Sequence, residues 1–449
     1  MYITTKTVKE IFFASSHPSY SKHYCRACTV KKLLSCAVRR EGALHFTMHS
    51  GQPELLIGAA AAVVVGVIGL HLRRRKRKAL PPCPAGETPA WLHPSSVPWQ
   101  MTEMAVPPLA RHEATAVTRD AFRLVFENMR DGILEELRRQ GAAPDATQHI
   151  GRMIDYNVPH GKCVRGLLVV QAFRAMAPSA NGRQLYQAMA AGWVLEWSQA
   201  AALVQDDMMD SAPTRRGRPS WYRVADVGYA AINDGLILEN QIFTLMRTHL
   251  LGEECYERLV SFVFDLLYVT EQGQLLDCRT PFADFSLARW EEIARTKTGI
   301  YTFYAPLHVA LELAGIKEHA TYQRTLSFAL AVGEYFQAQD DYLDCYGEPG
   351  AMGKQGTDIE NGKCSWLIVE ALRRASPAQR AALADNYGVD EPARVAAVKA
   401  TFDELRLREA FREFEATCVE RLRQQTARLD ASLVPVGQQL LQKLFKRAQ

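Results

Sequence analysis

The chain has 449 residues, of which 48% are hydrophobic and 23% charged, and its formal net charge is +4. This composition is globular and excludes collagen, low-complexity disorder and small disulfide scaffolds. The ten cysteines are scattered, and no second C-x-x-C pair joins Cys25 and Cys28 to complete a zinc site. We therefore expect reduced thiols in a compartment that faces the cytosol.

The charge is distributed unevenly along the chain. Residues 1–80 contain 14 Lys and Arg against 3 Asp and Glu, whereas the remainder contains 39 against 46. The larger part is therefore mildly acidic, and nothing in it indicates a nucleic-acid partner.

The basic N-terminal part contains one apolar run. Residues 55–72 have no formal charge, and six Arg and Lys follow directly at residues 73–78. The run approaches the ~20 residues that a helix needs to span a bilayer, and the basic cluster would stay on the cytoplasmic side. We expect a transmembrane or signal-anchor helix in the endoplasmic reticulum or mitochondrial outer membrane, with residues 1–54 as a basic extension.

Two alternatives to this anchor remain open. Residues 1–50 are basic and poor in acidic residues, as a cleaved mitochondrial presequence is. The apolar run would otherwise be a soluble, buried helix. Eight of the 21 prolines lie within residues 81–108, so residues 73–112 are predicted to be a basic cluster and a semi-rigid linker.

Residues 113–449 have the pattern of an all-α domain. Apolar residues recur at three- and four-residue spacing, as at Phe122, Val125, Phe126 and Met129. Residues 326–332 are apolar nearly all round, which is typical of a helix buried in a large bundle. No βαβ pattern is present.

A short acidic motif occurs twice, as QDDMMD at residues 205–210 and QDDYLD at residues 339–344. On a helix, Asp206 and Asp210 share one face, as do Asp340 and Asp344. Like charges at this spacing destabilise a helix, so we expect divalent cations to offset them. A solvated acidic face would account for one copy more readily than for two.

Basic residues near both motifs complete a predicted phosphate site. Arg binds phosphate through two parallel hydrogen bonds, and Lys acts as a point charge. Each of these residues taken singly is more often a surface cation, but their placement around two carboxylate clusters favours phosphate binding. They are Lys162, Arg165, Arg215, Arg216, Lys297, Lys354 and Lys363.

Residues 113–449 resemble the trans-isoprenyl diphosphate synthases, and most closely the farnesyl diphosphate synthase branch. Five stretches carry the resemblance: DDMMDSAPTRRGRPSWY (206–222), GQLLD (273–277), KTGIYTFY (297–304), FQAQDDYLD (336–344) and GKQGTDIENGKCSW (353–366). The resemblance implies a large helical bundle around a central cavity, and a homodimer. It also implies an enzyme that condenses an allylic diphosphate with isopentenyl diphosphate to give farnesyl diphosphate or a longer product.

The resemblance assigns roles to individual residues. Asp206, Asp210 and Asp340 would bind three Mg²⁺ ions, with Mn²⁺ as an alternative, and Asp207, Asp341 and Asp344 would complete the motifs. The allylic diphosphate would contact Arg215, Lys297 and Lys354, and isopentenyl diphosphate would contact Lys162, Arg165 and Arg216. The remaining matches are the polar cavity residues Gln199, Thr298, Tyr301 and Gln337, the motif residues Gln274 and Asp277, and Lys363 with Lys446 and Arg447, which would close over the site.

Product length is the least constrained of these expectations. Ala201 and Ala202 lie one turn before Asp206. The resemblance implies that animal farnesyl-forming members have bulky aromatic residues at these positions, which form the floor of the cavity. Two alanines leave room for a longer product such as geranylgeranyl diphosphate. Alternatively, alanine serves here only as a good helix former, and Met189 or another large residue supplies the floor.

Departures from the family pattern leave other functions open. His160 replaces the first glycine of a G-G-K motif, and Cys163 and Val164 replace residues that are commonly Tyr and Asn. A derived class I terpene synthase would ionise a prenyl diphosphate without isopentenyl diphosphate, although the retained Lys162 and Arg165 argue against it. An inactive, membrane-tethered helical scaffold is a third possibility, but neither aspartate motif is damaged.

Overall fold

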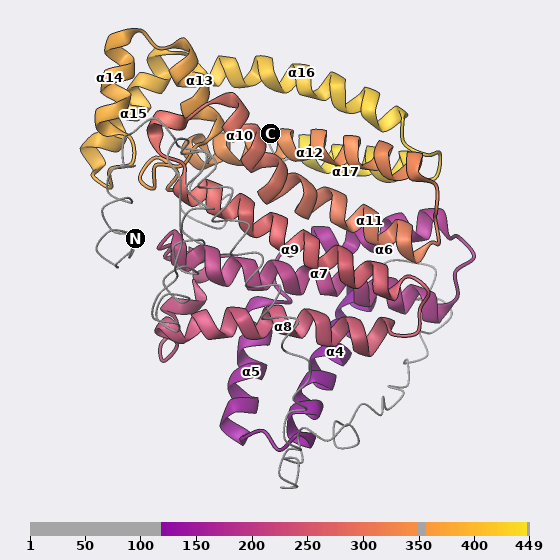
Figure 1. Ribbon diagram of the computed structural model, residues 1–449. Helices are drawn as coiled ribbons and strands as arrows, with labels where there is room; N and C mark the ends of the chain where they lie inside the picture. The colour runs from indigo at the N-terminus through magenta and orange to yellow at the C-terminus, as the bar shows by residue number, and fades with distance from the viewer. Residues whose placement is uncertain (1–117, 348–355, 447–449) are drawn as a thin grey trace, which may run out of the picture. The chain divides into compact units, whose positions relative to one another are not determined.

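The computed structural model describes residues 118–347 and 356–446. The predicted segments 1–54, 55–72 and 73–112 lie outside these ranges, as do Lys354 and Arg447. The helical class predicted from the sequence is confirmed for the described residues (Figure 1). In that part of the chain, no helix has the length and apolar character needed to cross a membrane.

The first six helices of the bundle include a long one, α7, that packs against α4, α6 and α8 (Figure 1). They are α4 (Arg119–Arg139), α5 (Pro144–Asn157), α6 (Val164–Met176), α7 (Gly182–Met209), α8 (Ala231–Leu250) and α9 (Tyr256–Arg279). The connection from α7 to α8 contains a short antiparallel hairpin, β1 (Thr214–Arg215) and β2 (Arg218–Pro219), followed by the 3₁₀ turns η2 (Trp221–Arg223) and η3 (Gly228–Ala230).

The second half forms another layer of the bundle. Its elements are η4 (Phe282–Asp284), α10 (Leu287–Ile293), η5 (Ala294–Tyr304), α11 (Ala305–Leu313), α12 (His319–Tyr346), α13 (Trp366–Arg374), α14 (Pro377–Asn386), α15 (Pro392–Glu404), α16 (Leu407–Ala427) and α17 (Val434–Phe445). The η5 segment is a π-helix that joins α10 to α11 in one continuous rod.

Helix α7 is central because its sequence permits burial on nearly every side. A capping box of Asn181 and Gln184 begins it, and its middle contains Trp193 and Trp197, both fully buried. Gly192 faces Gly166 of α6 so closely that a Cβ at Gly192 would lie 2.6 Å from the Gly166 carbonyl oxygen. The two helices therefore pack backbone to backbone at this point.

Two partly buried histidines make the stability of this bundle depend on pH. The His308 ring of α11 stacks on Phe262 of α9, with ring centroids 3.7 Å apart. Burial lowers the pKa of His308 from an ordinary 6.5 to about 4, and burial does the same to the pKa of His249 in α8. Since the folded-state pKa is depressed, stability is fully present above pH 6.5 and is lost as the pH falls toward 4.

We therefore expect the free energy of unfolding to decrease between about pH 6.5 and pH 4, by up to about 3 kcal/mol for each histidine. The variant His308→Phe keeps an aromatic stack but removes the titration, so its loss over this range is smaller. Chemical denaturation at several pH values measures the difference. His319→Phe, at the exposed start of α12, is the control, and equal losses in His308→Phe and the wild type would contradict the assignment.

Candidate functional site

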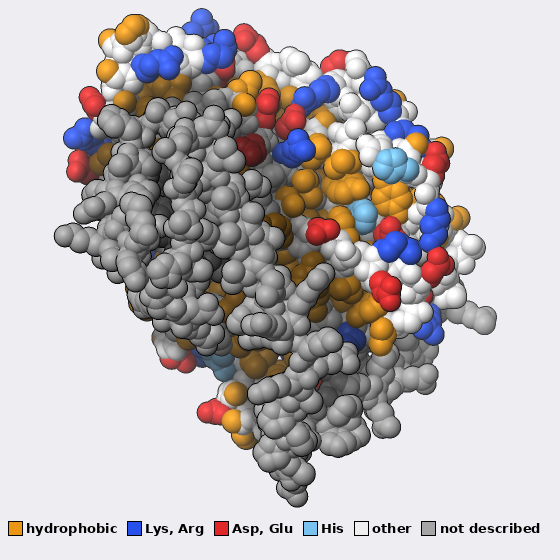
Figure 2. Space-filling view, in the orientation of Figure 1, with side chains coloured by type: hydrophobic (Ala, Val, Ile, Leu, Met, Phe, Trp, Pro, Cys, Tyr) orange, Lys and Arg blue, Asp and Glu red, His pale blue; other side chains and the backbone are white. Residues whose placement is uncertain are grey.

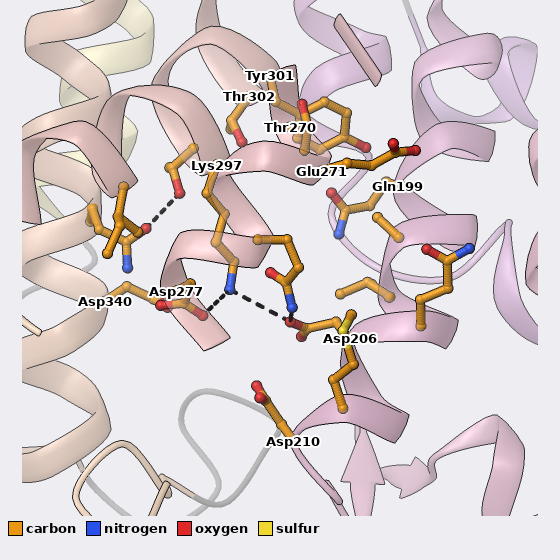
Figure 3. A pocket seen from close by; sticks show the side chains of 18 of the residues that line it. Gln199, Asp206, Asp210, Thr270, Glu271, Asp277, Lys297, Tyr301, Thr302 and Asp340 are labelled. Carbon is orange, nitrogen blue, oxygen red and sulfur yellow. Dashed lines mark hydrogen bonds and ion pairs between the residues drawn. The ribbon is translucent and has the colours of Figure 1, made fainter. Parts of the chain in front are cut away.

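A cavity of about 500 Å³ lies between α7, α9, η5 and α12. Both aspartate motifs contribute to its walls, through Asp206 and Asp210 on one side and Asp340 and Asp341 on the other. Figure 3 shows Asp206 and Asp340 entering from opposite sides, with the Lys297 side chain between them. The two acidic clusters that are far apart in the sequence therefore share one space.

The first motif is placed by the last turn of α7. Asp206 Oδ2 accepts a hydrogen bond from Arg215 Nη2 at 3.1 Å, and its Oδ1 accepts one from Gln274 Nε2 at 2.9 Å. Asp207 is buried and accepts from Arg215 Nε at 2.8 Å. The β1–β2 hairpin thus folds Arg215 back onto the motif that precedes it.

Asp277 of α9 joins two lysines that are far apart in the sequence. Its Oδ2 lies 2.7 Å from Lys297 Nζ and 2.9 Å from Lys363 Nζ, and Lys363 Nζ also lies 2.7 Å from Asp210 Oδ1. Burial alone would raise the pKa of Asp277, but the charges of Lys297 and Lys363 hold it below its ordinary value. Burial opposes the charge on Lys297, whose pKa is nevertheless raised by Asp277 and Asp206.

The second motif divides its aspartates between two tasks. Asp340 lines the cavity, and its negative charge contributes to the raised pKa of Arg215. Asp341 is buried: its Oδ2 accepts from Trp290 Nε1 at 2.8 Å and from the Trp366 backbone N–H at 2.7 Å. Burial raises the pKa of Asp341 to about 7.

The remaining motif aspartate stands apart from the cavity lining. Asp344 Oδ1 accepts from the backbone N–H of Thr357 at 3.0 Å, so it orders the chain that resumes after α12.

Thr298 donates to Gln337 Oε1 at 2.5 Å, and Gln337 donates to Asp341 Oδ1 at 2.8 Å. One chain of hydrogen bonds therefore joins Thr298 of η5 to Gln337 and the buried Asp341 of α12.

Most of the other predicted binding residues line the same cavity. Arg165 Nη2 donates to Thr302 Oγ1 at 2.7 Å, and its guanidinium lies 4.7 Å from the Tyr301 ring centroid. Burial raises the pKa of Tyr301. Gln199 also lines the cavity, and its Oε1 is buried without a hydrogen-bond partner among the described residues.

Of the predicted binding residues that the structure describes, two are not among those that line the cavity. Lys162 is exposed. Arg216 donates through Nη1 to the Asn157 carbonyl at 3.0 Å. The Arg216 guanidinium packs directly against Gly161: a Cβ at Gly161 would lie 3.0 Å from Arg216 Nε. Gly161 also has φ +114°, a conformation that favours glycine, so the sequence before Lys162 fits closely around Arg216.

The carboxylates suit a hard divalent cation in one particular way. Asp206, Asp210 and Asp340 offer oxygen ligands, which Mg²⁺ prefers. Within residues 118–347 and 356–446, no group of three or more Asp, Glu, His or Cys side chains is arranged to hold an ion by itself. Because Mg²⁺ usually keeps waters and shares its ligands with substrate phosphates, these walls fit ions held jointly with a diphosphate.

Ala201 and Ala202 of α7, the predicted chain-length residues, line the cavity as well. Met189 is fully buried in the core and is not among the lining residues, so it does not supply the floor. The sequence reasoning missed Leu267, Thr270 and Glu239, which also line the cavity. Leu267 and Thr270 lie seven and four residues before Gln274, so helical spacing back from the G-Q-x-x-D motif would have found them.

The chain is similar to several known proteins. Residues 147–405 match the family model described as polyprenyl synthetase. Farnesyl pyrophosphate synthase 1 of Lupinus albus is 41% identical over 313 residues, which cover 67% of this chain and 91% of that protein. Farnesyl pyrophosphate synthase of Zea mays is 39% identical over 339 residues, which cover 74% and 96%. A solved T. brucei farnesyl diphosphate synthase complexed with risedronate superposes with a TM-score of 0.70 at 32% identity, covering 74% of this chain and 99% of that one.

A glycine on α9 sets how closely the lysine of η5 approaches. A Cβ at Gly273 would lie 2.5 Å from the Lys297 backbone nitrogen and 2.8 Å from Lys297 Cα. We expect Gly273→Ala to displace η5 and to lower the free energy of unfolding by about 1–3 kcal/mol, measured by chemical denaturation. Gly182→Ala, at the start of α7 with no atom within 4 Å, is the control. Equal stability of Gly273→Ala and the wild type would show that this contact does not constrain η5.

Proposed function

Because the chain belongs to the polyprenyl synthetase family, we propose that it condenses an allylic diphosphate with isopentenyl diphosphate to give farnesyl diphosphate or a longer product. One observation carries this proposal. Two aspartate motifs face a single cavity that also contains Lys297, Lys363 and Arg215. Carboxylates and cations that surround one partly buried space are suited to a diphosphate with its metal ions.

Asp206, Asp210 and Asp340 are the residues that would hold Mg²⁺, and we propose three ions per site, with Mn²⁺ able to replace them. When bound, these ions neutralise the negative charge of the diphosphate. Lys297 and Arg215 add positive charge where the allylic diphosphate departs, which stabilises charge that develops as the C–O bond breaks. We assign isopentenyl diphosphate to Lys162, Arg165 and Arg216, and contacts with the allylic diphosphate also to Lys354, which lies outside the described residues.

The bond changes follow from this arrangement. The allylic C–O bond breaks and its electron pair leaves with the diphosphate, so an allylic cation remains. The double bond of isopentenyl diphosphate then forms the new C–C bond, and a proton passes from the adjacent carbon to the released diphosphate. The walls of the cavity must exclude water, because water would trap the cation as an alcohol.

The cavity also supports a proposal about product length. Ala201 and Ala202 are both in the lining, and each offers only a methyl group. We propose that this space admits the longer of the two alternatives, a product beyond farnesyl diphosphate such as geranylgeranyl diphosphate. Only C10 and C15 products from the purified protein would overturn this part of the proposal.

The full chain incubated with dimethylallyl diphosphate, isopentenyl diphosphate and Mg²⁺ tests the activity by mass spectrometry. We expect prenyl diphosphates that form only when isopentenyl diphosphate is present and that disappear when a chelator removes Mg²⁺. The double variant Asp206→Ala with Asp340→Ala should lose activity by a factor of about 10³ or more. Asp385→Ala, at an exposed position of α14, is the matched control.

Two outcomes would replace this function by an alternative. Consumption of farnesyl diphosphate to a hydrocarbon or alcohol without isopentenyl diphosphate would identify a class I terpene synthase. Absence of turnover with every allylic substrate would favour an inactive scaffold.

We also propose that the protein is a homodimer through one face of α8 and α9. Large hydrophobic side chains are exposed on these helices, including Leu236 at 49%, Phe264 at 57% and Tyr268 at 66%. Figure 2 shows hydrophobic side chains in the region of α8 and α9. A face of this kind is buried against itself in a twofold dimer, because each copy supplies the same patch.

We expect sedimentation to show a wild-type dimer and the variant Phe264→Glu to raise the dimer dissociation constant by at least about 30-fold. Leu124→Glu is the control, since this residue is a 50% exposed leucine on α4. A monomeric wild type, or an unchanged dissociation constant in Phe264→Glu, would refute this interface.

A further inference from the structure

One face of α9 extends the cavity away from the aspartates. Asp277, Gln274, Thr270 and Leu267 all line the cavity, and their spacing of three or four residues places them on one helical face. Gln274 marks the part of this face nearest the first aspartate motif, because it donates to Asp206. Leu267 is the lining residue of α9 farthest from that end, seven residues or roughly 10 Å of helix away. Leu267 therefore lies at the end of this helical face that is away from Asp206.

The direction along α7 is closed beyond the two alanines. Ser198 is the lining residue of α7 nearest the start of the helix. The next residues toward that end include Trp197 and Trp193, which are buried in the core together with Met189. Trp197 is also fixed by a 2.9 Å hydrogen bond from Nε1 to Gln241 Oε1. A hydrocarbon tail therefore has no path farther down α7.

The direction toward α8 is polar. Glu239 is the α8 residue in the cavity lining, and it hydrogen-bonds with Gln205 of α7. Gln205 can lie this close to α8 because Gly235 has no side chain: a Cβ there would lie 3.2 Å from Gln205 Cγ. Burial raises the pKa of Glu239, and the charge of Glu271 raises it further. A hydrocarbon placed over this carboxylate would remove it from water without a new partner, which is unfavourable.

With the direction along α7 closed and the side toward α8 polar, Leu267 is the apolar residue of α9 at the end of the cavity lining away from Asp206. We propose that Leu267 is a specificity-determining residue that sets the length of the product, with Ala201 and Ala202 serving only to leave the path open. The side chain would contact the last isoprenoid unit of the product and block the addition of another. This inference rests on the proposed prenyltransferase function and adds the residue that ends elongation.

The test compares product lengths from the full-length chain and its variants, with dimethylallyl and isopentenyl diphosphates and Mg²⁺. Leu267→Ala should increase at least fivefold the fraction of products longer than the main wild-type product. Leu267→Phe should decrease the mean length, with at least a fivefold rise in shorter products. Val260→Ala, on the same helix but not among the cavity-lining residues, should keep the wild-type distribution.

Opposite shifts in the two Leu267 variants would support the inference, and the phenylalanine variant keeps the test valid if the alanine variant folds poorly. Wild-type product distributions in active Leu267 variants would overturn it and leave the proposed function intact. Shortening by Ala202→Phe alone would then assign the limit to α7. Absence of any product that depends on isopentenyl diphosphate in the wild type would refute the proposed function itself.

Discussion

The site depends on charge balance between carboxylates and cations that the fold forces into one partly buried space. Asp277 contacts both Lys297 and Lys363, and Lys363 in turn contacts Asp210. Each of these groups would be unfavourable to bury alone, since an unpaired charge inside a protein costs free energy. Their mutual pairing holds α7, α9, η5 and the segment before α13 around one cavity. A negatively charged ligand that brings its own metal ions is suited to replace these ion pairs, since its anionic groups would pair with the lysines and its metal ions with the carboxylates.

Close backbone packing gives this network its geometry. Gly166 and Gly192 bring α6 against α7, and Gly273 brings α9 against the backbone of Lys297. The π-helix η5 carries Lys297, Thr298 and Tyr301 toward the cavity, and π-helical turns are frequent at functional sites. Short contacts of this kind leave little freedom for the lysine to move away from Asp277. The position of Lys297 therefore follows from helix packing, whereas Arg215 is placed by the β1–β2 hairpin and Lys363 by the segment before α13.

The two copies of the aspartate motif use their residues in parallel ways. In each copy the first aspartate, Asp206 or Asp340, lines the cavity. The second aspartate is buried and fastens the motif to a distant element: Asp207 binds Arg215 of the hairpin, and Asp341 binds Trp290 and the Trp366 backbone. The third aspartate differs, because Asp210 faces the cavity and Asp344 orders the chain that follows α12. Identical residue types thus serve binding or anchoring according to the partners that the fold brings to each carboxylate.

The sequence by itself was enough to predict the helical class, the two acidic motifs and most of the basic residues near them. Helical periodicity and motif spacing depend only on residues that are close together in the chain. Only the tertiary structure decided which residues meet. Asp277 stood in the sequence merely as part of a matched motif, and its role between Lys297 and Lys363 depends on contacts 20 and 86 residues apart. Glu239 gave no signal, since a glutamate on a helix is ordinary until the cavity shows where its side chain lies. Leu267 could be found only by helical spacing back from the G-Q-x-x-D motif. Helix packing sets these long-range distances, and no short stretch of sequence encodes them.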